Sequence, residues 1–222
     1  MAFPQYYSTN MVKRIGIMGG TFDPPHIGHL AMAEQVLEAM ALDMIWFIPT
    51  GKISYKDSSQ TASTQDRLEM TQLSTIDNPR FSVNTIETEM EGNSYTYKTL
   101  EILKERFPDY NFVFIVGADS LDYMENWREP ERIFDKCQVA AVNRMGISKK
   151  QLLEKREFLK ERFNADITLI EMPILDISST ELRKRIKQGK SIRYLVKDSV
   201  REYIAKNGLY ADAKGEDTYD RN

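Results

Sequence analysis

Met18-Gly-Gly-Thr-Phe-Asp-Pro-Pro-His-Ile-Gly-His29 follows a short apolar run, Ile15-Gly-Ile17, and leads into a helical pattern at residues 30–37. A strand, a glycine-containing turn and the start of a helix, in that order, make a site for a phosphate group. Gly19 and Gly20 let a ligand approach the backbone closely, and the unpaired amides at a helix N-terminus carry partial positive charge. The stretch therefore predicts an anion-binding turn between a first strand and a first helix.

The two histidines of the chain, His26 and His29, both lie in this stretch. They are three residues apart, so on the first turn of a helix they project from one face. Such a pair alone is also compatible with two helix-capping residues or with half of a metal site. Because all of the imidazole is concentrated in one glycine-lined turn, we interpret the pair as ligand-binding.

The composition indicates one soluble domain. The chain has 222 residues, 41% of them hydrophobic and 28% charged, which suits a sizeable core and a water-soluble surface. Its net charge of −3 does not indicate the excess of basic residues that is typical of proteins that bind nucleic acid. The single cysteine, Cys137, lies in an apolar run and is predicted to be buried and reduced. With no apolar run of membrane-spanning length and no signal-peptide pattern, we expect a cytoplasmic protein without a membrane partner.

Apolar runs typical of buried parallel strands alternate with helical patterns along the chain. The predicted strands are residues 13–18, 44–48, 81–83, 111–116, 138–142 and 167–170, and the predicted helices are residues 27–40, 64–76, 95–107, 149–163, 177–188 and 196–205. In residues 64–76 the helical spacing rests on Leu68 and Leu73, which are expected on the inner face. This alternation predicts a doubly wound, mostly parallel α/β sheet with right-handed crossovers. We interpret residues 13–210 as one domain with a small C-terminal helical part, residues 1–12 as a loose extension and residues 211–222 as a polar tail.

Ligands of such sheets bind beyond the carboxyl ends of the strands, at the point where the strand order reverses. Polar or glycine-containing segments follow several predicted strands, namely Gly19 to Phe22, Lys52 with Lys56, Gly117-Ala-Asp119, Asn143-Arg-Met-Gly146 and Ile177-Ser-Ser-Thr180. Since parallel strands end at one edge, these segments are predicted to share a site. The last of them, with Arg183 one turn on, forms a second predicted anion cradle. Taken alone, it would be better interpreted as a helix cap with a surface arginine.

The two anion motifs together, H-x-G-H at residues 26–29 and I-S-S-T-x-x-R at residues 177–183, resemble the motif pair of the H-x-G-H adenylyltransferase superfamily. Within it, residues 13–209 most resemble the bacterial nicotinate-nucleotide adenylyltransferase family. The supporting segments are Ser94-Tyr-Thr-Tyr-Lys-Thr-Leu100, Gly117-Ala-Asp-Ser-Leu121, Trp127 and Tyr194-Leu-Val196. Two segments depart from the family pattern. Ile53-Ser-Tyr-Lys56 replaces proline-proline-histidine-lysine, and Arg144-Met-Gly146 replaces arginine-proline-glycine, so the lysine and the arginine are kept.

The resemblance implies a Rossmann-like nucleotidyltransferase fold and a direct reaction. The 5′-phosphate of nicotinate mononucleotide attacks the α-phosphorus of ATP, and pyrophosphate leaves. It implies four catalytic residues: His26 and His29 hold the ATP phosphates, with His29 the more catalytic, and Lys56 and Arg183 neutralise the developing negative charge. Mg²⁺ accompanies ATP through phosphate oxygens and water, so no protein metal site is expected. The remaining residues implied for ATP are Gly19, Gly20, Thr21, Phe22, Ile177, Ser178, Ser179 and Thr180.

For nicotinate mononucleotide, the helix start at Ser94, Tyr95 and Thr96 offers free amides to the carboxylate that distinguishes nicotinate from nicotinamide. Trp127 either stacks on the pyridine ring or packs in the core. Asp119 either accepts a ribose hydroxyl or caps the next helix. Arg144 completes the predicted set.

Two alternatives to this interpretation stay open. Phosphopantetheine adenylyltransferases share both anion motifs, although their chains are typically shorter and the segments around Ser94 and Trp127 speak against them. A non-catalytic nucleotide-binding sensor would keep the same fold, but it need not retain His29, Lys56 and Arg183 together. The sequence leaves open whether the protein is a monomer or a homo-oligomer.

Overall fold

The computed structural model describes residues 13–51, 61–143, 147–173 and 175–211. Its sheet has six parallel strands in the order β3-β2-β1-β4-β5-β6. The strands are β1 (Arg14–Gly20), β2 (Met44–Pro49), β3 (Phe81–Val83), β4 (Asn111–Gly117), β5 (Gln138–Asn143) and β6 (Ile167–Glu171). The predicted doubly wound parallel sheet is confirmed, and its order reverses between β1 and β4.

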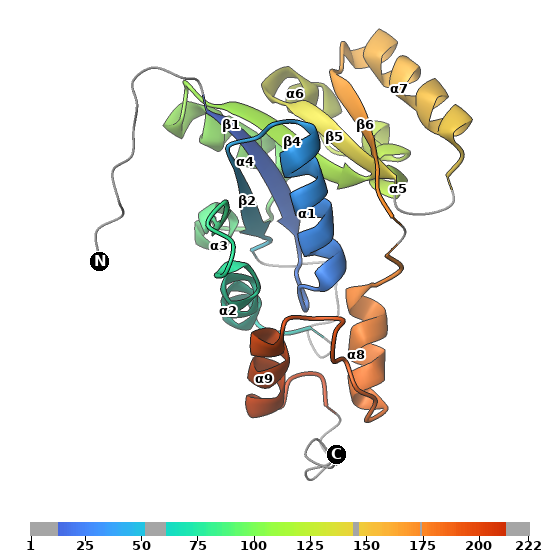
Figure 1. Cartoon of the computed structure of the whole chain (residues 1–222). Coiled ribbons are helices and arrows are strands. Elements are labelled where there is room, and N and C mark those ends of the chain that lie inside the picture. The colour runs from blue at the N-terminus through green and yellow to red at the C-terminus, as the bar shows by residue number, and fades with distance from the viewer. Residues whose placement is uncertain (1–12, 52–60, 144–146, 174, 212–222) are drawn as a thin grey trace.

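Helices follow the strands along the chain (Figure 1). They are α1 (Ile27–Ala39), α2 (Thr64–Thr75), α3 (Ile86–Glu89), α4 (Thr96–Arg106), α5 (Ala118–Leu121), α6 (Pro130–Lys136), α7 (Lys149–Phe163), α8 (Ser179–Lys187) and α9 (Asp198–Lys206). The four-residue α3 was not predicted, because one turn is too short to show a helical period. Among the described helices, none combines the length and hydropathy that crossing a bilayer requires.

The two faces of the sheet carry separate cores, and β4 shows why. Its alternate residues Phe112, Phe114 and Val116 belong to one apolar cluster, while Val113 and Ile115 belong to the other. Helices α4, α6 and α7 cover the first face, and α1 covers the second. Burial on both sides explains why this strand is a continuous apolar run. The predicted burial of Cys137 is confirmed, and burial raises the pKa of its thiol to about 12.

Helix α2 differs from the sequence prediction in the face that it buries. Leu68 and Leu73 were expected to point inward, but both are half-buried, and the fully buried side carries Arg67, Met70, Thr71 and Ser74. The hydroxyl of Thr71 donates to the carbonyl of Arg67 at 2.7 Å, and that of Ser74 donates to the carbonyl of Thr71 at 2.8 Å. Because these hydroxyls are satisfied within the helix, they can be buried at little cost.

The C-terminal helices lie beyond the carboxyl ends of the strands (Figure 1). Helices α8 and α9 pack with α2 in a third apolar cluster, which includes Met70, Leu182 and Val200. A backbone hydrogen bond of 2.9 Å from Ile27 N to Leu195 O joins this part to the start of α1. The edge at which ligands of such sheets bind is therefore bordered by the C-terminal helices.

Candidate active site

A pocket of about 360 Å³ opens at the carboxyl ends of β1, β2 and β4. It lies at the reversal of strand order, where doubly wound sheets bind ligands. Its walls are Ile17, Gly19, Gly20, Thr21, Ile48, Thr50, Glu87, Asn93, Ser94, Tyr95, Thr96, Thr99, Leu100, Phe114 and Trp127. The predicted anion turn and the predicted nicotinate segment therefore share one cavity.

The start of α4 forms one side of this pocket. Tyr95 caps the helix in an extended conformation, so the amides of Thr96 and the next two residues have no acceptor within the helix. Arg128 donates from Nη1 to the Tyr95 hydroxyl at 3.0 Å and lies 4.6 Å from the centre of its ring. These contacts hold the helix start in place with its amides beside the cavity.

Trp127 packs against the core and also borders the pocket, so its stacking on a pyridine ring stays a prediction. Its ring packs edge-on against Phe114, with centroids 6.1 Å apart, and the side chain also lines the pocket. Asp119 lies in the first turn of α5 and is exposed, and it is not among the residues that line the cavity. Arg144 and Lys56 lie outside the described residues.

The acidic residue of the pocket, Glu87, was missed from the sequence. Its side chain is buried, and the Thr99 hydroxyl donates to Oε1 at 2.8 Å. Burial raises the pKa of the Glu87 carboxyl, against the opposing effects of the Thr99 and Ser94 hydroxyls and of the Arg67 charge. Gly51 makes room for this segment, because a Cβ there would lie 2.2 Å from the carbonyl oxygen of Glu87.

We expect Glu87→Gln to raise the melting temperature at neutral pH, since it removes a carboxylate whose ionisation burial opposes. The folded-state pKa lies above the ordinary 4.5. The stabilising contribution of the protonated form is therefore complete below that ordinary value and is lost as the pH rises through the folded-state pKa. The difference in melting temperature between variant and wild type should be small near about pH 4 and larger near about pH 8.

The control is Glu89→Gln, which removes an exposed carboxylate of the same helix that accepts the Thr85 hydroxyl. The glutamine at position 87 keeps an oxygen for the Thr99 hydroxyl, so hydrogen bonding is matched. A difference for Glu87→Gln that is the same at both pH values would contradict the assignment of burial as the dominant effect.

The two imidazoles are stacked at the start of α1. The ring centroids of His26 and His29 are 3.6 Å apart with the planes at 23°, and Phe22 meets His29 edge-on at 5.1 Å. The backbone N–H of His26 donates to His29 Nδ1 at 3.2 Å. Because Nδ1 accepts, a neutral His29 carries its proton on Nε2, which makes Nε2 a donor.

The glycine of H-x-G-H has a steric role. A Cβ on Gly28 would lie 3.0 Å from Nδ1 of His26, so a side chain there would displace the stacked imidazole. Phe22, predicted to bind ATP, is 1% exposed and packs against Phe47 with ring centroids 5.7 Å apart. Its side chain belongs to the core, and its ring supports the imidazole of His29 through the edge-on contact.

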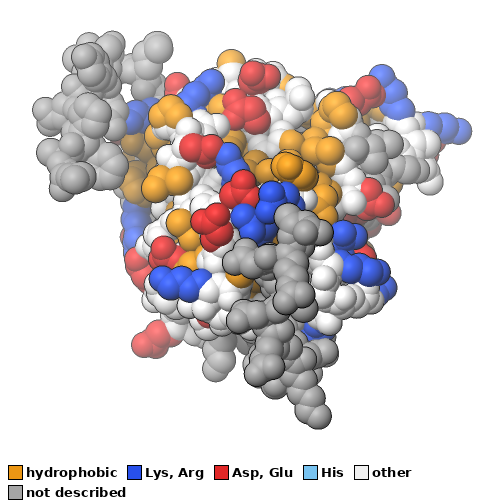
Figure 2. All heavy atoms as spheres, turned by 60° about the horizontal axis from the view of Figure 1, so that its bottom comes forward, with side chains coloured by type: hydrophobic (Ala, Val, Ile, Leu, Met, Phe, Trp, Pro, Cys, Tyr) orange, Lys and Arg blue, Asp and Glu red, His pale blue; other side chains and the backbone are white. Residues whose placement is uncertain are grey.

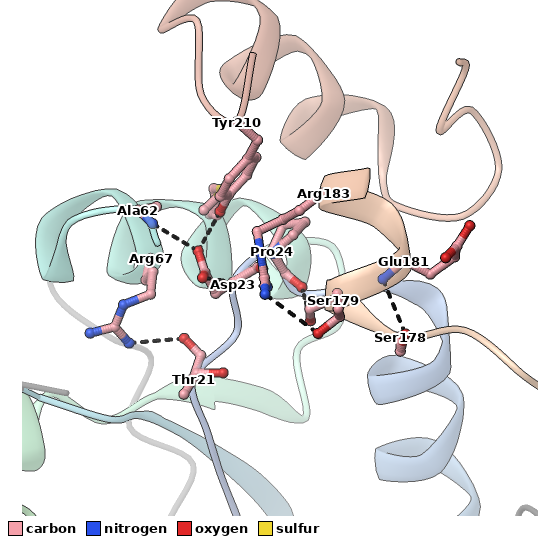
Figure 3. A network of polar contacts seen from close by, with 12 residues as sticks. Thr21, Asp23, Pro24, Ala62, Arg67, Ser178, Ser179, Glu181, Arg183 and Tyr210 are labelled. Carbon is pink, nitrogen blue, oxygen red and sulfur yellow. Dashed lines mark hydrogen bonds and ion pairs between the residues drawn. The ribbon is translucent and has the colours of Figure 1, made fainter. Parts of the chain in front are cut away.

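The second anion motif packs directly on the first. Ser178 caps α8 by accepting the amide of Glu181 at 3.2 Å. The Ser179 hydroxyl donates to the carbonyl of Pro24 at 2.8 Å, and Arg183 Nη1 donates to the carbonyl of Asp23 at 2.7 Å (Figure 3). Ile177 lies beside Gly28, and Thr180 accepts from Arg183 Nη2 at 3.4 Å. Residues from the two ends of the chain are thus joined in one site.

Two buried charged residues of this region were also missed. Asp23 is fully buried, and Arg67, 1% exposed, donates to the carbonyls of Thr21 at 2.9 Å and of Gly51 at 2.8 Å. The signal for Arg67 was its position on the same helical face as Met70 and Ser74, three and seven residues away. The two guanidinium groups of Arg67 and Arg183 therefore hold the carbonyls of Thr21 and Asp23, two residues apart in the anion-binding turn (Figure 3).

The surface on this side of the molecule carries both signs of charge. Figure 2 brings the carboxyl-end side forward and shows basic side chains near its middle, with acidic and hydrophobic ones between them.

Within the described ranges, no group of three or more His, Cys, Asp or Glu side chains is arranged to hold a metal ion.

Comparison with known proteins agrees with this geometry. A family model described as cytidylyltransferase-like matches residues 17–185. A probable nicotinate-nucleotide adenylyltransferase of Lachnoclostridium phytofermentans is 42% identical over 199 residues, which are 90% of this chain and 100% of the relative. One of Exiguobacterium sibiricum is 43% identical over 198 residues, 89% of this chain and 99% of the relative.

The fold is shared with a solved structure. The nicotinic acid mononucleotide adenylyltransferase of Plasmodium falciparum, solved in complex with NaAD, has a TM-score of 0.74 with this chain. The match covers 89% of this chain and 97% of that chain at 23% identity. The predicted Rossmann-like arrangement is therefore confirmed.

Proposed function

This chain belongs to the nicotinate-nucleotide adenylyltransferase family of cytidylyltransferase-like proteins, and on that premise we propose how its site performs adenylyl transfer. ATP and nicotinate mononucleotide are the substrates, and deamido-NAD and pyrophosphate are the products. One observation supports this most directly. A single pocket combines Gly19 and Gly20 at the end of β1 with the free helix start at Thr96 and the ring of Trp127.

The reaction is a direct displacement at phosphorus. An oxygen of the 5′-phosphate of nicotinate mononucleotide bonds to the α-phosphorus of ATP, and the bond from that phosphorus to the bridging oxygen of the β-phosphate breaks. The protein forms no covalent bond, so its contribution is the positioning of two anions and the stabilisation of the charge that develops between them.

We assign the ATP phosphates to the joined anion motifs. The Nε2–H of His29 and the guanidinium of Arg183 would donate to phosphate oxygens, together with the amides at the start of α8. His26 acts beside His29, and Lys56 completes the set of cations. ATP enters as its Mg²⁺ complex, with the ion carried on phosphate oxygens as part of the substrate.

We assign the nicotinate group to the pocket beside α4. Its carboxylate would accept from the amides at Ser94, Tyr95 and Thr96, and its ring would lie against Trp127. Asp119, which follows β4, is assigned to a ribose hydroxyl. Arg144 remains assigned to the same nucleotide.

The decisive assay is pyrophosphate release from ATP with nicotinate mononucleotide, with phosphopantetheine, and with no acceptor. Of these three conditions, we expect pyrophosphate release only when ATP and nicotinate mononucleotide are both present. Release with phosphopantetheine would favour the first alternative, and ATP binding without release under any condition would favour a nucleotide sensor.

The enzyme should also prefer nicotinate over nicotinamide mononucleotide by a factor of about ten or more in kcat/KM. The carboxylate accepts a charge-assisted hydrogen bond that a neutral amide receives more weakly, and such bonds contribute about 1.5–3 kcal/mol. A site built for one polar group also rejects a near-isostere that leaves its donors poorly paired. Equal use of both nucleotides by the wild type would refute the carboxylate pocket.

Thr96→Pro tests the source of this preference, because it deletes one amide at the first position of a helix, where proline is tolerated. Tyr95 is already extended, with φ −121 and ψ 134, as the residue before a proline should be. Discrimination between the two nucleotides should shrink. Lys149→Pro makes the same change at the first position of α7, after the extended Ser148, and should leave it unaltered.

A further inference from the structure

We propose that Tyr210, at the C-terminal end of the described chain, is a positioning residue for Arg183 and acts through the buried carboxylate of Asp23. The inference rests on the proposed function in one respect: Arg183 is the residue assigned to the ATP phosphates. It adds a part of the site that lies far from the phosphate motifs in sequence.

The contacts form a chain from the Tyr210 hydroxyl to the Arg183 guanidinium (Figure 3). The hydroxyl donates to Asp23 Oδ1 at 2.6 Å, and the amide of Ala62 donates to the same oxygen at 3.0 Å. The other carboxylate oxygen, Oδ2, lies 3.5 Å from Arg183 Nη1. With two donors on Oδ1, the carboxylate plane is held, and Oδ2 is directed at the guanidinium.

The hydroxyl is suited to act as a permanent donor. Burial and the charge of Asp23 raise the pKa of Tyr210, so the phenol keeps its proton over the whole physiological range. Leu209 and Tyr210 pack against the apolar cluster of α2, α8 and α9. The turn that follows α9 therefore places the hydroxyl beside Asp23, which has 0% exposure.

The guanidinium of Arg183 is held mainly by Asp23, because its other contact, from Nη2 to the Thr180 hydroxyl within α8, is long at 3.4 Å. Nη1 contacts the carbonyl and the carboxylate of Asp23, and the side chain is 15% exposed. A planar fork binds phosphate well only when its orientation matches the ligand, and an arginine held in advance loses less rotational freedom on binding. Without the Tyr210 hydroxyl, the carboxylate keeps one anchoring donor on Oδ1, and the orientation of the fork is less restricted.

The chain offers a matched control. Tyr203, in α9, donates its hydroxyl to Asp66 Oδ1 at 2.9 Å, so Tyr203→Phe removes the same kind of bond from the same helical part. That aspartate has no contact with Arg183 among the hydrogen bonds and ion pairs of the described residues. If the two tyrosine hydroxyls had a structural role only, Tyr210→Phe and Tyr203→Phe would have the same effect on MgATP binding.

The experiment is calorimetric titration of MgATP into Tyr210→Phe and Tyr203→Phe, without acceptor nucleotide, after thermal unfolding has shown both to be folded. We expect Tyr210→Phe to bind MgATP about tenfold more weakly, as the loss of one hydrogen bond to a charged group allows. Tyr203→Phe should bind it like the wild type. The KM for nicotinate mononucleotide should not move in either variant.

The same titrations in an Arg183→Lys background complete a double-mutant cycle. Lysine has no planar fork to orient, so Tyr210→Phe should cause no further loss there. Wild-type affinity in Tyr210→Phe, an equal loss in Tyr203→Phe, or an undiminished loss in the Arg183→Lys background would each overturn the proposal. Since no acceptor is present, failure to use nicotinate mononucleotide would overturn the proposed function and leave this result standing.

Discussion

Replacement of His29 by alanine should lower kcat by about a hundredfold or more while leaving the protein folded. A preorganised donor aimed at charge that develops in the transition state contributes about 3 kcal/mol, because it acts where water is excluded and needs no reorientation. His29 fits this role, since Nδ1 accepts the backbone N–H of His26 and Nε2 is left as the donor. The ring is held between His26 and Phe22, so its orientation is set before ATP arrives.

The measurement is steady-state kcat for pyrophosphate release, with thermal unfolding to show that the fold is kept. His29→Gln is the informative companion, because its side-chain amide carries a donor at a reach similar to Nε2 and should recover part of the rate. A His29→Ala variant with near-normal kcat would remove the assignment of His29 as a catalytic residue.

Arg67→Met should destabilise the protein by about 3 kcal/mol, as expected when a charged group that is buried among its partners is removed. Its guanidinium holds the carbonyls of Thr21 and Gly51, which belong to two loops that border the pocket. The positive charge of Arg67 also lowers the pKa of the Glu87 carboxyl, in opposition to the effect of burial. The variant therefore leaves the buried carbonyl of Gly51 and the partly buried carbonyl of Thr21 short of a donor, and the buried carboxyl of Glu87 without its compensating charge.

Urea unfolding at neutral pH measures this effect. Arg156→Met serves as the control, because Arg156 pairs with Glu157 at 2.7 Å on the surface and should change stability by less than about 1 kcal/mol. Adding Glu87→Gln to Arg67→Met should recover part of the loss, since the uncompensated carboxylate is gone. Equal destabilisation by Arg67→Met and Arg156→Met would contradict the prediction, because burial of Arg67 would then add nothing to the free energy of unfolding.

Local patterns in the sequence were sufficient for the strands and for the two anion motifs. An apolar run such as that of β4, buried on both faces, is visible in a few consecutive residues, and so is a glycine turn that leads into a helix. Ser178 could be predicted as a helix cap for the same reason, because a cap bonds to an amide three residues on. Each of these features depends on neighbours along the chain.

The pattern of hydropathy gave the wrong buried face for α2, where polar side chains form their hydrogen bonds within the helix. In α2 the hydroxyls of Thr71 and Ser74 bond to carbonyls of their own helix, so the polar side faces inward and Leu68 and Leu73 are only half-buried. A pattern that counts apolar residues assigns such a helix to the wrong face.

Only the tertiary structure brought together the charged groups that support the site. Asp23 and Tyr210 are 187 residues apart in sequence, and Arg67 and Thr21 are 46 apart. A buried charge is tolerated only when its partners meet it in space, and no residue pattern near Asp23, Arg67 or Glu87 records where those partners lie. The groups that contact ligands lie in short motifs, whereas the groups that hold them in place come from distant segments that packing brings together.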